Sequence, residues 1–118
     1  MTNDLAERLL DYGAKVIALI EALPKTIAGN RIGDQLLRSG TSVGANYEEA
    51  QAAESRNDFT HKLQIALKEL RESHYWLRLL AKTKIVSNEK LEELTDEATQ
   101  LRAILSKAVV TAKKKKQG

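Results

Sequence analysis

The chain has 118 residues, a length typical of one domain. It contains no cysteine, which excludes a disulfide framework and thiolate metal sites. One proline, one phenylalanine and many Ala, Leu, Glu, Lys and Arg residues favour long helices. No apolar run approaches the roughly 18 residues that span a membrane, and the first residues resemble no targeting signal. We therefore expect a cytoplasmic protein.

The formal net charge of +3 depends on the end of the chain. Of the 19 Lys and Arg residues, four are consecutive lysines at positions 113–116, against 16 Asp and Glu residues. Without these four lysines, 15 basic residues oppose 16 acidic ones, a net charge of −1. An argument for nucleic-acid binding must therefore rest on where the charges lie and not on their sum.

The first helix is predicted from Asn3 or Asp4, either of which suits an N-cap, to the residue before Pro24. Its apolar residues recur at spacings of four and three: Leu5, Leu9, Tyr12, Val16, Leu19 and Leu23. Residues 25–30 read as a loop, and Gly29-Asn30 is its strongest turn signal.

The second helix is less certain from its sequence. Ile32, Leu36, Val43 and Tyr47 share one face, but residues 39–44 are mostly small and polar. Each glycine inside a helix costs about 1 kcal/mol relative to alanine. Either the helix breaks near Ser39, or close packing compensates for these residues. We favour one helix, because residues 40 and 44 are glycines on one face and would let a neighbour approach.

The third helix is predicted to begin at Ser55 or Asn57, where residues 55–58 resemble a capping box. Its heptad-like seam consists of Phe59, Leu63, Ala66, Leu70, Ser73, Leu77 and Leu80. The fourth helix follows Ser87-Asn88, and its seam consists of Leu91, Leu94, Ala98, Leu101, Leu105 and Ala108.

The apolar pattern stops after Val110. We therefore expect residues 1–112 to form the folded domain and residues 113–118 to be a disordered basic tail. Four helices joined by short loops predict an all-α, antiparallel up-down four-helix bundle.

Two predicted helices carry more apolar residues than one seam requires. The additional residues are Leu10, Ile17 and Ile20 in the first helix and Ile65, Trp76 and Leu79 in the third. They form either a broad core stripe or a subunit interface, since monomers seldom leave large apolar patches exposed.

No constellation predicts an enzyme. Residues 40–44 match the G-x-S-x-G elbow of hydrolases, but no strand precedes them and the chain is too short for the hydrolase sheet. The di-iron site of a bundle requires two Glu-x-x-His motifs, whereas His61 follows Asp58 and His74 follows Arg71 at that spacing. We expect no catalytic residue, no metal and no cofactor.

The most informative polar feature lies in the third helix. Five residues recur there at steps of three and four, opposite the seam: Lys68, Arg71, Tyr75, Arg78 and Lys82. This basic stripe can neutralise phosphates along a nucleic acid, and its tyrosine can stack on a base. A flexible electrostatic arm would be added by Lys113, Lys114, Lys115 and Lys116. The alternative is an ordinary solvated face, balanced by the nearby Glu69 and Glu72.

About half of the chain resembles a known family at the level of motifs. The matching segments are QLLR (35–38), SVGANYEEA (42–50), SRNDF (55–59) and HKLQIALKE (61–69), followed by YWL (75–77) and LL (79–80). On these segments the chain is similar to the 23S rRNA intervening-sequence proteins, small bacterial four-helix bundles. The accessory protein of diversity-generating retroelements is related to them.

The resemblance implies a homopentamer whose basic surface meets nucleic acid. Retroelement accessory proteins also bind their reverse transcriptase, which implies a protein partner. The resemblance further implies that Asp58 caps the third helix and that Phe59 packs in the core. The near-neutral folded part of this chain departs from the strongly basic members of the family.

Two functions follow as hypotheses. In the first, the chain is a non-catalytic oligomeric accessory protein that binds RNA or DNA through the basic stripe and the lysine tail. In the second, it is a scaffold that holds a partner protein such as a reverse transcriptase, without binding nucleic acid itself. Binding should depend steeply on salt in the first case and mainly on apolar and aromatic residues in the second.

Overall fold

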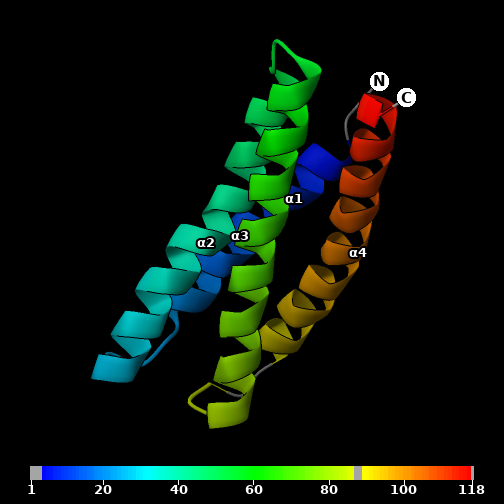
Figure 1. The fold of residues 1–118 in the computed structure, drawn as a ribbon. Coiled ribbons are helices and arrows are strands. Elements are labelled where there is room, and N and C mark those ends of the chain that lie inside the picture. The colour runs from blue at the N-terminus through cyan, green and yellow to red at the C-terminus, as the bar shows by residue number, and fades with distance from the viewer. Residues whose placement is uncertain (1–3, 87–88, 118) are drawn as a thin grey trace.

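The computed structural model describes residues 4–86 and 89–117, with side chains to residue 115 (Figure 1). Its four helices are α1 (Asp4–Glu21), α2 (Ile27–Gln51), α3 (Arg56–Thr83) and α4 (Glu89–Gln117). Consecutive helices run in opposite directions, so α1 begins and α4 ends at the same end of the molecule (Figure 1). The described residues contain no strand. The predicted all-α four-helix bundle is confirmed.

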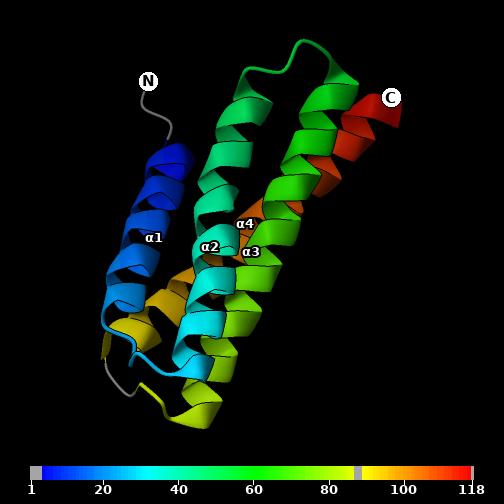
Figure 2. The same cartoon turned by 90° about the vertical axis from the view of Figure 1, so that its left-hand side faces the viewer.

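Each helix packs on two neighbours, in the order α1, α2, α3, α4 and back to α1. The contact between α2 and α3 is the most extensive, and the contact between α1 and α4 is the smallest. The reason is visible in Figure 2, where α4 starts close to the end of α1 and diverges from it towards its own C-terminal end. The bundle is therefore closed along α2 and α3 and more open between α1 and the second half of α4.

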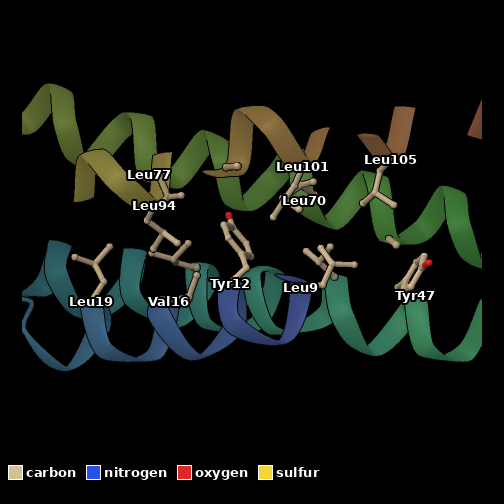
Figure 3. Packing of buried hydrophobic residues seen from close by; sticks show 14 of the residues in the cluster. Leu9, Tyr12, Val16, Leu19, Tyr47, Leu70, Leu77, Leu94, Leu101 and Leu105 are labelled. Atoms are coloured by element: carbon tan, nitrogen blue, oxygen red, sulfur yellow. The ribbon is translucent and has the colours of Figure 1, made fainter. Parts of the chain in front are cut away.

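The core is built mainly from leucines that point inward from all four helices (Figure 3). Tyr12 is fully buried among them, and its hydroxyl lies 2.8 Å from the hydroxyl of Ser73. Because the Ser73 hydroxyl donates to the Leu70 carbonyl at 2.9 Å, Tyr12 must be the donor to Ser73. Burial raises the pKa of Tyr12 to about 12. This hydrogen bond joins α1 to α3, which lie diagonally across the core.

Helix α2 is continuous through residues 39–44, as we favoured from the sequence. A Cβ atom on Gly40 would lie 2.9 Å from Cγ2 of Val16, so α1 approaches α2 closely at this point. A Cβ atom on Gly44 would lie 3.5 Å from Leu9, an ordinary van der Waals contact between the same two helices. The hydroxyl of Ser39 donates to the Gln35 carbonyl at 2.8 Å, within the helix. Close helix packing therefore compensates for the poor helix formers in this segment.

The predicted loop over residues 25–30 is confirmed for residues 25–26 and wrong for residues 27–30, because α2 already begins at Ile27. Thr26 is its N-cap, and the hydroxyl of Thr26 accepts a hydrogen bond from the amide of Gly29 at 3.0 Å. Gly29 and Asn30 therefore lie in the first turns of the helix and form no turn between helices. Helix α1 ends at Glu21, before Pro24, as predicted. The N-cap proposed at Asn3 lies outside the described residues.

Helix α3 begins where its capping residues predicted. The hydroxyl of Ser55 accepts a hydrogen bond from the amide of Asp58 at 3.0 Å, so Ser55 is the N-cap. The resemblance had assigned this role to Asp58, which instead supplies the donor. Phe59 packs partly buried against the core. Helix α4 begins at Glu89, directly after Ser87-Asn88, as predicted.

Helix α4 continues to Gln117, so the expected disorder of the lysine tail is corrected for residues 113–117. Two observations explain the continuation. Ala112 is only 3% exposed, which extends the packed face two residues beyond Val110. Lysine is also a good helix former, so the helix can continue without further burial.

The additional apolar residues of the first and third helices have two different environments. Ile20 and Trp76 are partly buried against the core, and Ile65 and Leu79 are half-buried. Leu10 and Ile17, in contrast, are 65% and 45% exposed. The broad core stripe thus accounts for four of the six residues and leaves Leu10 and Ile17 exposed on the outer side of α1.

Candidate nucleic-acid interface

The basic stripe lies on the solvent side of α3, opposite the buried seam. All five of its residues are exposed: Lys68, Arg71, Tyr75, Arg78 and Lys82. The ring of Tyr75 is 53% exposed and stands edge-on to the ring of Trp76, with 5.1 Å between the ring centroids. One face of the helix therefore presents four cations and an accessible aromatic ring.

Arg38 of α2 holds the two acids that were expected to balance the stripe. Its Nη1 donates to Oε2 of Glu69 at 2.8 Å, and its Nη2 donates to Oε2 of Glu72. The indole of Trp76 also donates to Oε2 of Glu72, at 3.1 Å. Burial opposes the charge of Glu72, but the hydrogen bonds from Arg38 and Trp76 outweigh it and lower the pKa of Glu72; the charge of Lys68 adds a smaller effect.

The cations of the stripe form no ion pair with any described residue. Glu69 and Glu72, the acids nearest to them in α3, are instead turned towards α2 by Arg38. The interpretation of the stripe as a face neutralised by its own acids is therefore weakened. Because exposed charges act over about 10 Å at 0.1 M salt, four cations in one row produce a continuous positive surface.

A groove between α3 and α4 brings part of the lysine tail to the stripe. Lys68 and Arg71 line one side of the groove, and Lys113 lines the other. Leu67 and Val109 form its apolar part. The sequence placed Lys113 on a mobile arm, whereas the helical end of α4 fixes it beside the stripe.

Neither Lys114 nor Lys115 lines the groove beside the stripe. Lys114 and Lys115 are exposed, and Lys115 lines a different groove, on the side of α4 that lies near Phe59. Lys116 belongs to α4, and its side chain lies outside what the structure describes. The sequence predicted one flexible arm, whereas the described lysines 113–115 belong to a helix, and among them Lys113 alone lines the groove beside the stripe.

Arg102 of α4 is a basic residue beside the stripe that the sequence analysis missed. Its Nη1 donates to Nδ1 of His74 at 3.0 Å, and the same histidine lies close enough to Arg78 for their charges to interact. The hydroxyl of Thr99 donates to the Thr95 carbonyl at 3.1 Å, so it accepts from Nε2 of His74 at 3.4 Å. Only the packing of α4 on α3 reveals this neighbourhood, because residues 78 and 102 are far apart in sequence.

His74 is only 7% exposed, and burial together with the charges of Arg102 and Arg78 lowers its pKa. Above pH 6.5 His74 is neutral in both the folded and the unfolded chain. Below that pH the unfolded chain gains a proton that the folded chain resists, so stability falls. We expect the free energy of unfolding to decrease by at most about 1.4 kcal/mol per pH unit between pH 6.5 and the lower pKa of the folded state.

Urea unfolding of wild type and His74→Gln at several pH values between 7.5 and 5 measures this effect. In the His74→Gln chain, the free energy of unfolding should no longer decrease in this way below pH 6.5. The control His61→Gln changes the exposed histidine of the same helix and should retain the decrease. Equal pH dependence in all three chains would show that His74 is not the titrating group.

The described residues contain no arrangement that suggests catalysis or metal binding. Ser42 lies inside α2, where its hydroxyl donates to the Arg38 carbonyl, so it does not occupy the strand-to-helix turn of a hydrolase. Within residues 4–86 and 89–117, no three His, Asp or Glu side chains lie close enough together to hold a metal ion. No described helix is both long and apolar enough to cross a membrane.

Comparisons with known proteins identify the family. The model of the 23S rRNA-intervening sequence protein family matches residues 2–107. A crystal structure of a protein of unknown function from the S23 ribosomal protein family of Bacteroides thetaiotaomicron is 34% identical, with a TM-score of 0.79; the match covers 89% of this chain and 97% of that one. No curated protein matches the chain. Since the family model spans most of its length, the chain belongs to the 23S rRNA-intervening sequence protein family.

Proposed function

We propose that this chain is a non-catalytic, homo-oligomeric accessory protein that binds RNA or DNA through the basic stripe and the adjoining side of α4. The observation that carries the proposal is the pairing of Glu69 and Glu72 with Arg38 of α2, while the exposed cations of the stripe have no ion pair with any residue that the structure describes. The name of the family makes ribosomal RNA a natural candidate ligand.

The dimensions of the stripe suit a nucleic-acid backbone. Lys68 and Lys82 are 14 residues apart, which corresponds to about 21 Å along a helix. Four cations over this length can each replace a counterion at a phosphate, which supplies affinity without sequence specificity. Tyr75 lies between Arg71 and Arg78, where its exposed ring can stack on an unpaired base.

We include a homo-oligomer in the proposal because the family resemblance implies a pentamer. The compartment that we expect is the cytoplasm. Several copies would present several stripes to one nucleic acid, which strengthens binding without any new contact within a copy. Resemblance to retroelement accessory proteins supports the second candidate function, a scaffold for a protein such as a reverse transcriptase. The exposed Leu10 and Ile17 suit a protein partner, which is either a different protein, as in this candidate, or a second copy of this chain.

The salt dependence of binding tests the proposal and separates the two functions. A labelled structured RNA and a labelled DNA duplex are titrated with the full chain at several salt concentrations, and binding is followed by fluorescence anisotropy. If about four phosphates are neutralised, the logarithm of the association constant falls against the logarithm of salt with a slope of about −3.6 on duplex DNA. No binding at low salt would reject the nucleic-acid function and leave the protein scaffold.

A further inference from the structure

The outer side of α1 carries exposed apolar and acidic residues, and Lys15 is the one exposed base among the described residues of this helix. Leu10 and Ile17 are 65% and 45% exposed, and Ala14 lies exposed between them. Beside them α1 and α2 enclose a surface groove of about 560 Å³, and the charged residues that line it are Asp11 and Glu48. We call this surface the acidic apolar face and define it by Leu10, Asp11, Ala14, Ile17, Ala45 and Glu48.

A second groove, of about 450 Å³, opens beside the C-terminal half of α4. All charged residues that line it are basic. We call it the basic apolar groove and define it by Arg56, Phe59, Leu63, Lys107, Ala108 and Lys115. The groove exists because α4 diverges from α1 (Figure 2), so that among the described residues α1 reaches it only with Leu5.

We propose that the acidic apolar face of one copy of this chain packs into the basic apolar groove of a second copy. The inference rests on the assembly included in the proposed function and names the two surfaces that form it. Each copy carries both surfaces, so every copy can contact two others.

Charge selects this pairing over the alternatives. A face on a face would bring Asp11 and Glu48 against the same two acids, and a groove on a groove would bring Arg56, Lys107 and Lys115 against the same three cations. A face in a groove places carboxylates beside cations and removes Leu10 and Ile17 from water. Because the two surfaces are different, the contact is heterologous, and repeated contacts close into a ring or extend into a filament.

Charge reversal on each surface tests the proposal without nucleic acid. One variant carries Asp11→Lys with Glu48→Lys, a second carries Lys107→Glu with Lys115→Glu, and a third carries all four changes. The control Glu93→Lys with Asp96→Lys reverses two exposed acids on the first half of α4. Sedimentation equilibrium measures the mass of each chain at low salt, with all chains at the same micromolar concentration. Urea unfolding verifies that each chain is folded.

Wild type and control should have several times the 13.1 kDa mass of one chain, and each two-residue variant should fall to that mass. The four-residue variant should regain assembly. An equimolar mixture of the two monomeric variants should form species of two or more copies, since opposite charges face each other wherever the two variants alternate, although a ring with an odd number of copies cannot alternate throughout. A monomeric wild type would overturn the proposal. The basic apolar groove would then be covered by another part of the same chain or by a different protein. It would also be overturned if only one of the two reversals dissociated the assembly, or if the mixture stayed monomeric.

The outcome is independent of nucleic-acid binding, which is measured through the stripe on α3. A monomeric chain that binds RNA or DNA with steep salt dependence would remove this inference and leave the nucleic-acid function standing. An assembly that responds to the charge reversals as expected, but binds no nucleic acid, would support this inference and remove the nucleic-acid function.

Discussion

The variant Arg71→Glu with Arg78→Glu is expected to bind RNA or DNA on the order of a hundredfold more weakly than wild type at low salt. Each reversal removes one phosphate contact and adds a repulsion, and about 1.4 kcal/mol per site corresponds to a factor of ten. The salt slope should become shallower by about 1.8 on a duplex and about 1.4 on a single strand, because two counterions fewer are released. Anisotropy titrations at several salt concentrations measure both quantities.

The matched control is Lys25→Glu with Lys90→Glu, two exposed lysines outside the stripe. It changes the net charge by the same amount, so a response to total charge alone would weaken both variants equally. We expect the control to retain most of the wild-type affinity and nearly all of its salt slope. If both variants bind like wild type, the stripe is a solvated face, and the nucleic acid binds to another surface of the chain.

Replacing Gly29 with alanine is expected to destabilise the fold by about 3 kcal/mol, although alanine is the better helix former. A Cβ atom at this position would lie 2.1 Å from the carbonyl oxygen of Pro24. That oxygen belongs to the backbone of a short connection between α1 and α2, which must move before the methyl group fits. Urea unfolding measures the change as a lower midpoint at an unchanged slope.

Gly33, one turn later in α2, supplies the control. A Cβ atom there would meet only Ile20 and Leu23 side chains, at 3.5 Å, an ordinary van der Waals distance. Gly33→Ala should therefore stabilise the chain by up to about 1 kcal/mol, because alanine loses less backbone entropy in a helix. If both substitutions stabilised it to the same degree, α2 would not begin as close to Pro24 as the structure places it.

Local sequence patterns predicted the helices and failed at two of their ends. Pro24 has a fixed φ angle, and the hydroxyl of Ser55 caps the helix that follows it. Both effects are local, so the end of α1 and the start of α3 could be predicted from one or two residues. Thr26 caps α2 in the same local way, but this signal was missed because Gly29-Asn30 resembles a turn; Gly29 is instead required by the position of the Pro24 carbonyl. The end of α4 was missed because burial of Ala112 depends on neighbouring helices.

The candidate site also has features that the sequence predicts and features that depend on the tertiary structure. By itself the sequence determined the four-helix bundle and the exposed row from Lys68 to Lys82, because helical periodicity fixes which residues share a face of one helix. Only the tertiary structure decided that Arg38 takes Glu69 and Glu72 away from that row, and that Lys113 joins it. These relations connect residues of different helices, whose rotation and offset are set by the packing of the core.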